Sequence, residues 1–578
     1  MRRIPALSIL SLVLLGLISC GDSGDSGSGP TPQVASVIVS PGELTLVVGE
    51  SQQLNAAPQD EEGNPITGLS VVWSSSAETV ATVSASGVVM GVAAGSTTIS
   101  ATVEGKAGTA TISVTPEPSV PVASVSVSPP ELTFVQGGSQ QFNATPLDEA
   151  GNAVFGRAIA WTTSDPSVAT VSETGLVSGL GVGAATITAT SEGKSGTAEV
   201  SISVVTFAAT AAGGAHTCAL TTDGATYCWG RGESGQLGVP VPMLRCTTDA
   251  GPYPCSSAPV QVRGGIAFMQ LALGGAHTCG LTSDGSAYCW GSNGDGQLGH
   301  STQSYDTPTP VDTDLKFTSL DAGSQHTCGL TSSGTAFCWG RNDRGQLGDG
   351  TTDGRSVPQA VTGDHTFQLI VAGGFNIGHT CALTNDGDAY CWGDNERGQL
   401  GNGDGGFGQE DLAPHPVPAP VVGAPTFVSL TAGLGRHTCG LTSMGDAYCW
   451  GENSFGALGN RSTGDKATPV PVYGGLEFSL VIAGGFIGHT CALTTGAAAY
   501  CWGENSVGQI GDNSLIDRLA PAAVFGGHSF TTLDSGFRHT CGLTATGTLY
   551  CWGSGGAGQL GTGSDTQESV PTKVVGQP

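Results

Sequence analysis

Positive charge is scarce in this sequence. The chain of 578 residues has 19 Lys and Arg against 47 Asp and Glu, which gives a formal net charge of −28 and a pI near 4.5. A surface that binds nucleic-acid phosphates needs clustered Lys and Arg, so this balance argues against nucleic acid as a partner. Charged residues of both signs make up only 11% of the chain, which is under half the usual share.

Long apolar segments are missing after the first twenty residues, and cysteine is missing between residues 21 and 217. No later segment is therefore long enough to span a bilayer. The rest of the chain is rich in cysteine, with an odd total of 17. In a cytosolic protein that number would indicate metal or redox sites, whereas in an exported protein it predicts disulfides with one thiol left over. With 92 Gly and 31 Pro, the chain stays below the Gly and Pro content of disordered low-complexity sequence.

The N-terminus predicts export. Two arginines precede an apolar run from Ile4 to Ile18, which is too short for a comfortable membrane span. The run ends at Cys20, and residues 1–20 resemble a bacterial lipoprotein signal, which implies that this cysteine becomes the lipidated N-terminus. The alternative is a secretory signal with an incidental cysteine. Residues 21–33 are rich in Gly, Ser and Asp and fit a flexible linker.

Two copies of one segment follow this linker. VASVIVSPGELTLVVGESQQLNA, starting at Val34, returns as VASVSVSPPELTFVQGGSQQFNA, starting at Val122, at an ungapped offset of 88 residues. Short runs of alternating apolar and polar residues, broken by Gly and Pro, are typical of a small β-sandwich. Residues 34–116 and 121–205 resemble bacterial Ig-like domains of group 2. The resemblance implies two spacer domains that form a stalk.

From residue 206 a different unit takes over. AGGAHTCALTTDGATYCWGRGESGQLG, at 212–238, has seven copies, each with two cysteines ten residues apart and a Trp directly after the second. We expect four strands in each copy. In the second copy they are expected at about 258–264, 267–274, 277–283 and 287–292. Such a unit, of about 50 residues and repeated seven times, is typical of a β-propeller.

The recurring H-T-C-x-L-T, Y-C-W-G and G-Q-L-G segments resemble the regulator of chromosome condensation repeat family. The resemblance covers residues 206–578 and implies a seven-bladed β-propeller. The expected fold class is all-β, with this propeller preceded by two Ig-like β-sandwich domains. Because the first unit lacks the outer strand that precedes the later ones, we expect residues 569–576 to complete blade 1 beside residues 205–212 and to close the ring.

The paired cysteines predict disulfides across hairpins. A three-residue loop with Gly224 in the left-handed position places Cys218 opposite Cys228, at about 4.5 Å between Cα atoms, which is within disulfide range. A soft-metal site is the competing interpretation, but the spacing is not that of a zinc site and no second pair converges on it. In the sixth unit Gly496 comes one position early, which leaves its turn type open. The predicted pairs are Cys218–Cys228, Cys279–Cys289, Cys328–Cys338, Cys381–Cys391, Cys439–Cys449, Cys491–Cys501, Cys541–Cys551 and, within an insertion, Cys246–Cys255. Cys20 remains for the lipid.

One histidine recurs in every unit. Seven imidazoles related by a ring cannot converge on one metal ion, so we expect each to serve its blade by hydrogen-bonding a neighbouring loop. The recurring Trp and GQLG segments are expected to provide packing between blades and tight turns. The seven histidines are His216, His277, His326, His379, His437, His489 and His539.

Function is expected where the units differ. The hairpins are nearly uniform, whereas the loops before the histidines and the insertions at 239–259 and 402–420 vary, and strand parity places both on one face. Exposed Phe and Arg in a rigid ring have the composition of interface hot spots. The alternative is that these aromatics only plug the mouth of the channel. The candidate binding residues are Phe375, Asn376, Ile377, Arg436, Phe486, Ile487, Phe537 and Arg538.

Three function classes follow from these features. A binding module on a stalk fits best, because export, acidic charge and disulfides oppose the nucleotide-exchange role of the family's namesake. The sequence offers an enzyme no paired carboxylates at fixed spacing, no nucleophile motif and no metal constellation. Asp404, Glu410, Asp411 and His415 do cluster in one loop, which we interpret as solvated or at best as a weak calcium site.

We therefore expect a monomeric, non-enzymatic lipoprotein of the bacterial outer membrane or cell surface. It is expected to bind an unknown protein or glycan and to touch the membrane only through its lipid. We expect no catalytic residue, no cofactor and no metal. An extracellular polysaccharide-active or inhibitory propeller protein is the alternative.

Overall fold

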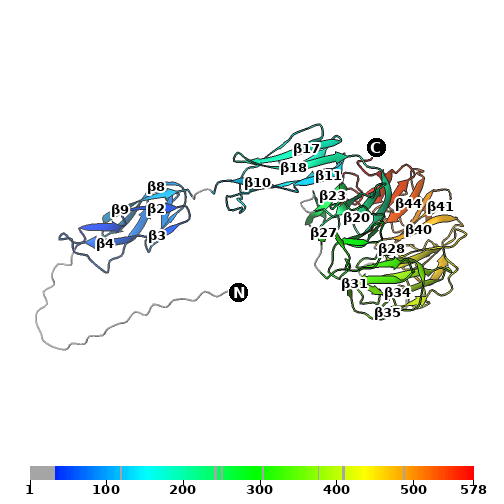
Figure 1. Cartoon of the computed structure of the whole chain (residues 1–578). Coiled ribbons are helices and arrows are strands. Elements are labelled where there is room, and N and C mark those ends of the chain that lie inside the picture. The colour runs from blue at the N-terminus through cyan, green and yellow to red at the C-terminus, as the bar shows by residue number, and fades with distance from the viewer. Residues whose placement is uncertain are drawn as a thin grey trace, which may run out of the picture. The chain divides into compact units, whose positions relative to one another are not determined.

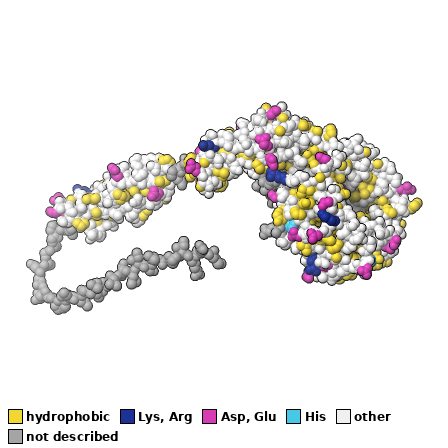
Figure 2. All heavy atoms as spheres, in the orientation of Figure 1, with side chains coloured by type: hydrophobic (Ala, Val, Ile, Leu, Met, Phe, Trp, Pro, Cys, Tyr) yellow, Lys and Arg dark blue, Asp and Glu magenta, His cyan; other side chains and the backbone are white. Residues whose placement is uncertain are grey.

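The computed structural model describes residues 33–116, 120–239, 244–248, 251–301, 305–374, 377–405, 411–485 and 488–578. All secondary-structure elements in these ranges are β-strands, which confirms the all-β class (Figure 1). Nothing in the same ranges forms an apolar helix of membrane-spanning length. The signal segment with Cys20 lies outside them. The chain divides into two compact units at Val120, and the visible surface carries few charged side chains, which are scattered singly or in small groups (Figure 2).

The first unit contains residues 34–116, which we call repeat 1. Its strands form a two-stranded, a three-stranded and a four-stranded sheet. Alternation along KAGTATISVT places Ala110, Ile112 and Val114 in the core together with Leu46 and Ile99. The strands are β1 Ser36–Ser40, β2 Glu43–Val47, β3 Ser51–Gln53, β4 Asn55–Gln59, β5 Val72–Ser75, β6 Ala81–Val83, β7 Val88–Gly91, β8 Gly95–Val103 and β9 Lys106–Thr115.

Residues 121–205, which we call repeat 2, have the same strand plan but belong to the second unit. Strand β11 pairs in parallel with β18 and also contacts β23 of the propeller, where Phe134 pairs with Val260. The larger sheet of repeat 2 thereby continues into the first blade. The strands are β10 Ser124–Ser128, β11 Glu131–Val135, β12 Ser139–Gln141, β13 Asn143–Leu147, β14 Ala160–Thr163, β15 Ala169–Val171, β16 Leu176–Gly179, β17 Gly183–Ser191 and β18 Lys194–Ser203.

The propeller has seven blades of four antiparallel strands, each blade running in chain order from the axis outward. An extra hairpin strand, β22, accompanies the outermost strand of blade 1. The strands of blades 1 to 3 are β19 Phe207–Ala212, β20 His216–Thr221, β21 Thr226–Arg231, β22 Leu244–Thr248 and β23 Gly251–Gln261; β24 Gln270–Leu273, β25 His277–Leu281, β26 Ala287–Gly291 and β27 Tyr305–Pro310; β28 Phe317–Ala322, β29 His326–Thr331, β30 Ala336–Gly340 and β31 Arg355–Ala360.

Blades 4 to 7 repeat this plan without an extra strand. Their strands are β32 Phe367–Gly373, β33 His379–Thr384, β34 Ala389–Asn395 and β35 Asp411–Pro420; β36 Ser429–Thr431, β37 His437–Leu441, β38 Ala447–Gly451 and β39 Lys466–Pro471; β40 Phe478–Gly484, β41 His489–Thr494, β42 Ala499–Gly503 and β43 Arg518–Ala523; β44 Phe530–Ser535, β45 His539–Thr544, β46 Leu549–Gly553 and β47 Glu568–Lys573.

The predicted closure of the ring by a C-terminal strand in blade 1 is wrong. Strand β47 pairs with β46, with Thr572 opposite Cys551, and is the outer strand of blade 7. Blade 1 has its own outer strand, β23, which contains the residues expected to begin blade 2. A repeat period fixes the cyclic order of strands but not where a blade begins, and here each blade is one continuous stretch of chain. The segment after β47 does reach the start of the propeller, where the Val205 amide donates to the Gly576 carbonyl at 2.8 Å.

Each blade hairpin carries one of the predicted disulfides. The two cysteines face each other in register, with Cα atoms 4.0 to 4.1 Å apart in all seven blades. Cys246 and Cys255 also pair, with their Cα atoms 5.8 Å apart. In the hairpin of blade 6, Ala497 takes the left-handed position with φ 63°, so the turn is kept although Gly496 precedes that position.

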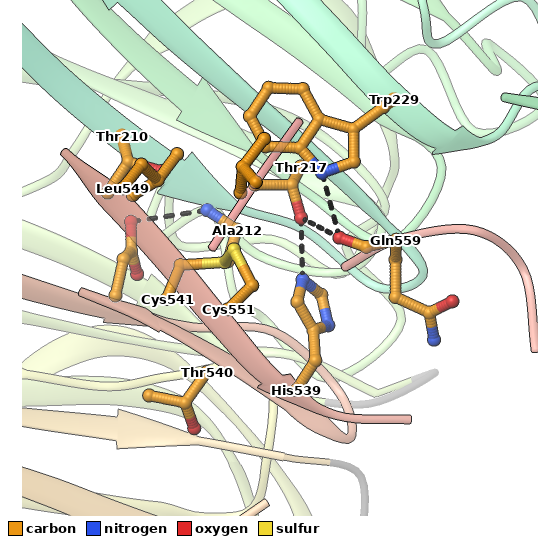
Figure 3. Close-up of a disulfide and its surroundings, with 12 residues drawn as sticks. Thr210, Ala212, Thr217, Trp229, His539, Thr540, Cys541, Leu549, Cys551 and Gln559 are labelled. Carbon is orange, nitrogen blue, oxygen red and sulfur yellow. Dashed lines mark hydrogen bonds between the residues drawn. A yellow bond between two sulfur atoms is a disulfide. The ribbon is translucent and has the colours of Figure 1, made fainter. Parts of the chain in front are cut away.

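The seven histidines join neighbouring blades through a repeated hydrogen-bond network. At the junction of blades 7 and 1, the Thr217 hydroxyl donates to the Gln559 carbonyl at 2.8 Å, and His539 Nε2 lies 2.8 Å from the same hydroxyl (Figure 3). Because the hydroxyl proton goes to the carbonyl, the histidine donates from Nε2. Trp229 Nε1 donates to the Gln559 carbonyl as well, at 3.0 Å.

The same contact occurs at every junction, so it forms a closed ring. The sequence predicted that each histidine bonds a neighbouring loop. Its partner is instead a threonine on the second strand of the next blade. The pairs are His216–Thr278, His277–Thr327, His326–Thr380, His379–Thr438, His437–Thr490, His489–Thr540 and His539–Thr217. Close approach also requires glycine: at Gly348 (φ 70°) a Cβ would lie 2.7 Å from Trp392 Nε1 of the next blade.

Candidate recognition face

The variable loops lie at one end of the propeller, which we call the loop face. It contains the turns between the first and second strands of each blade and the connections between the third and fourth strands. The opposite end, the hairpin face, contains the short hairpins between the second and third strands. Of the eight predicted binding residues, four lie outside the described residues. These four are Phe375, Asn376, Phe486 and Ile487.

The two candidate arginines, Arg436 and Arg538, are held by acidic residues of the preceding blade. Arg436 Nη1 lies 3.3 Å from Glu396 Oε2, and Arg538 Nη2 lies 3.3 Å from Glu504 Oε1. Both arginines directly precede a blade histidine, and so does Gln325, which donates to Asp295 at 3.0 Å. The side chain at this position therefore bridges two blades. The other two described candidates are Phe537 and Ile377. Ile377 is half-buried in the turn of blade 4.

Phe537 lines a cavity of about 240 Å³ on the loop face, at the junction of blades 7, 1, 2 and 3. The ring lies against the first turn of blade 1, because a Cβ added at Gly214 would meet Phe537 Cε2 at 2.7 Å. The side chains of Arg231 and Glu233, which form an ion pair at the cavity, are about 40% exposed. Phe537 therefore packs against the neighbouring blade and also lines the cavity.

The cavity combines one aromatic ring with a pair of opposite charges and several neutral polar groups. Its other lining residues are Ala215, Gly275, Ala276, Ser292, Gln297, Ser324 and Gln325. An aromatic anchor surrounded by amide, hydroxyl and charged groups is the usual composition of a site that orients a polar ligand. Sequence reasoning found Phe537 because it precedes a histidine. It missed Arg231 and Glu233. The sequence indicates them only through the variation, from blade to blade, of the residues that follow each W-G.

Burial perturbs the acidic side chains behind this face. It raises the pKa of Asp295 and of Asp394 above the usual value for a carboxyl group, although neighbouring arginines oppose the shift. The pKa of Glu452 is raised for the same reason, and Arg436 and Arg397 oppose that shift. Asp394 is only 1% exposed. These three buried carboxyl groups therefore lie close to arginines that partly offset their charge.

The acidic cluster of the 402–420 insertion is organised by an asparagine. Asn395 donates to the Asp411 carboxylate at 2.9 Å and to the Asp404 carbonyl at 3.0 Å. His415 Nε2 lies 2.7 Å from Asp411 Oδ2. Although burial opposes it, these hydrogen bonds hold the pKa of Asp411 below its usual value. Glu410 lies outside the described residues, and within them no group of three or more His, Cys, Asp or Glu forms a metal-binding cluster.

Comparison with known families bears on the whole propeller. The family model described as RCC1-like domain matches residues 46–433 and 252–578. The chain belongs to the RCC1-like domain family. Among curated relatives, the ultraviolet-B receptor UVR8 of Arabidopsis thaliana is 32% identical over 316 residues, which are 54% of this chain and 57% of the relative. The mitochondrial RCC1 domain-containing protein RUG3 of the same plant is 28% identical over 315 residues, 53% of this chain and 55% of the relative.

The RCC1-like chain therefore spans little more than half the length of these two relatives. Among solved structures, Prp20p of Saccharomyces cerevisiae matches with a TM-score of 0.52 and 21% identity. That match covers 61% of this chain and 87% of the yeast chain. Human WBSCR16 matches with a TM-score of 0.50 and 21% identity, covering 59% of this chain and 87% of the human chain. At these identities the similarity establishes the propeller fold.

Proposed function

We propose that this RCC1-like chain is a bacterial surface lipoprotein whose propeller binds a protein partner on its loop face. The observation that carries the proposal is the cavity lined by Phe537, Arg231 and Glu233 on that face. In our proposal, repeats 1 and 2 are Ig-like domains that hold the propeller away from the membrane. The lipid on Cys20 anchors the chain.

Three features support a binding role for this face. The seven disulfides and the ring of histidine contacts fix the blades, so loops on this frame present their side chains with little loss of conformational entropy on binding. Loop length and composition vary more on this face than among the short hairpins of the opposite face. A structure described as Kap60 bound to yeast RCC1 (Prp20), and one of Prp20p described with its binding to Gsp1p and histones, name protein partners for a relative of this fold, which supports a protein-binding role.

The test is capture of a partner by the soluble chain, residues 21–578, from the envelope fraction of the organism that makes it. Phe537→Ala removes the aromatic anchor, and we expect it to weaken capture at least tenfold, as loss of a hot-spot residue does. Met444→Ala is the matched control, because Met444 is an apolar residue of the hairpin face that is 76% exposed. Equal capture by both variants would refute the loop face as the binding site.

The captured partner is then purified and its affinity for each variant is measured. Binding of a purified protein that depends on Phe537 supports the proposal. If the captured component is a glycan, or if Met444→Ala is the damaging change, the proposal of a protein-binding loop face is wrong. A folded Phe537→Ala variant is recognised by its unchanged thermal midpoint within a few degrees.

A further inference from the structure

A second cavity, of about 120 Å³, lies on the propeller axis between the innermost strands of all seven blades. Alanine, glycine and aliphatic residues form most of its wall. Its four residues with polar side chains are Asp321 of blade 3, Thr431 of blade 5, and Asp534 and Ser535 of blade 7. No Lys, Arg or His is among the lining residues.

Asp321, Thr431 and Asp534 occupy the same position in their blades. Each lies four residues after the buried Phe that begins the innermost segment, and each stands opposite the first cysteine of its hairpin. These residues lie on blades 3, 5 and 7, so blade 4 separates the first two and blade 6 the last two. The structure therefore brings three oxygen-bearing side chains to one level of the axis, from residues more than one hundred positions apart in the sequence.

Each of these side chains accepts a hydrogen bond from the backbone of the next blade. The Ala372 amide donates to Asp321 Oδ2 at 2.8 Å, and the Ala212 amide donates to Asp534 Oδ2 at 3.2 Å. The Ala483 amide donates to Thr431 Oγ1 at 3.0 Å. These bonds hold the oxygens in place but do not exhaust them, because a carboxylate has about four acceptor positions.

The two carboxylates are poorly compensated. Burial raises the pKa of Asp321 to about 6 and that of Asp534 to about 7, and the charge of Asp321 adds to the shift at Asp534. An anionic pair in such a place is stable only with a proton or a cation beside it. The amides of the next blades supply partial positive charge and no full charge.

A separate observation indicates a missing partner in the same cavity. Ser535 is 5% exposed and lines the cavity, yet its Oγ is buried without a hydrogen-bond partner among the described residues. Buried hydroxyl groups in native proteins are nearly always satisfied, because leaving one unpaired costs about 1–3 kcal/mol. The unsatisfied hydroxyl therefore requires a ligand or a water molecule at this site.

We propose that the axial cavity binds one Ca²⁺ ion through Asp321 and Asp534, with Thr431 and Ser535 as further oxygen donors. A donor set made only of oxygen suits hard cations. Calcium accepts six to eight oxygens in irregular arrangements and tolerates water among them, whereas Mg²⁺ demands a near-regular octahedron, so donors drawn from three different blades favour the more adaptable ion. This site departs from the sequence-based expectation of no metal.

The test uses the soluble chain, residues 21–578, treated with a chelator and then titrated with CaCl₂ at pH 8. We expect one binding event by calorimetry and a thermal midpoint that rises with Ca²⁺ concentration. In the double variant Asp321→Asn with Asp534→Asn both responses should be lost. Asparagine keeps an acceptor oxygen for the Ala372 and Ala212 amides, so the contacts between blades survive. Asp223→Asn, on an exposed hairpin, is the matched control and should respond as the original chain does.

Two further measurements keep the proposal testable if the double variant does not fold. Ser535→Ala should weaken Ca²⁺ binding while the chain stays folded. In the unaltered chain the affinity should fall about fivefold between pH 8 and pH 6.5, because protons compete for both carboxylates. No calcium response in the unaltered chain, an undiminished response in the double variant, or an equal response to Mg²⁺ would each overturn the assignment. Partner capture is measured separately, so failure here leaves the recognition face untouched.

Discussion

Repeats 1 and 2 share one strand plan, yet repeat 1 forms its own unit and repeat 2 is part of the propeller unit. Strands β3 and β12 have the identical sequence SQQ. Gln52, in the middle of β3, is exposed, whereas Gln140, in the middle of β12, is 1% exposed. The same three residues therefore serve as solvent-facing surface in one copy and as an interface in the other.

The difference lies in a few neighbouring positions. Repeat 2 has Gly138 where repeat 1 has Glu50, and a Cβ at position 138 would lie 2.9 Å from the Ala258 Cβ of blade 1. Val135 is fully buried and joins the cluster that contains Trp229, whereas its counterpart Val47 is only half-buried. A small residue in place of a charged one at position 138 thus allows the close approach to blade 1.

The largest expected effect is a difference between the two units in how their free energy of unfolding depends on pH. Burial lowers the pKa of the seven blade histidines to about 3 or 4, and repeat 1 has no histidine. Below the ordinary value near 6.5 the unfolded propeller binds more protons than the folded one, so its free energy of unfolding falls as the pH falls. At pH 5 each histidine removes about 2 kcal/mol. Five carboxyl groups of the propeller have raised pKa values and oppose this trend, but they are fewer than the seven histidines; they are Asp295, Asp321, Asp394, Glu452 and Asp534.

Hydrogen exchange measured by mass spectrometry at pH 7.5 and pH 5, corrected for the intrinsic rate, tests this difference on the full chain. We expect the propeller strands to lose protection by on the order of 10 kcal/mol, or to unfold, while strands β8 and β9 keep theirs. Equal behaviour of the two regions, or a propeller unaffected at pH 5, would contradict the role assigned to the buried neutral histidines.

Local features of the fold could be predicted from the sequence. The hairpin disulfides follow from a ten-residue spacing around a three-residue turn, and both cysteines of each pair lie within one blade. The number of blades follows from the repeat count. The position of Phe537 on the loop face follows from strand parity, which holds whichever strand begins the blade.

Features that depend on contacts across long sequence separations could not be predicted. SVPTKVV fits the outer strand of blade 7 as well as that of blade 1, so pattern alone did not decide the closure. The docking of repeat 2 depends on Gly138, one small residue among many glycines. The axial cavity gathers Asp321, Thr431 and Asp534 from three blades, and each residue alone has no recognisable motif.

Exchange of residues between the repeats should break the docking. Gly138→Glu places a side chain and a charge against Ala258, and we expect a loss of about 3 kcal/mol or more in the stability of repeat 2 on the propeller. The reciprocal change Glu50→Gly, at the matching exposed position of repeat 1, should alter stability by less than about 1 kcal/mol. Hydrogen exchange of β11 and β12 measures the first effect and that of β2 and β3 the second. Undiminished protection in Gly138→Glu would show that the docked arrangement does not depend on this close approach.

The smallest expected effect concerns the shared glutamine. Gln140 Nε2 donates to Ser256 Oγ at 2.6 Å, and Ser256, which is fully buried, donates in turn to the Ala258 carbonyl at 2.6 Å. Gln140→Ala removes a buried hydrogen bond, and we expect it to destabilise the interface by about 1–2 kcal/mol. Gln52→Ala, the same change on the exposed copy, should stay within about 0.5 kcal/mol. Both are measured by denaturant unfolding.

A double-mutant cycle with Ser256→Ala should then give a coupling of about 1 kcal/mol. Equal effects of the two glutamine changes would mean that this contact does not distinguish the docked copy from the free one.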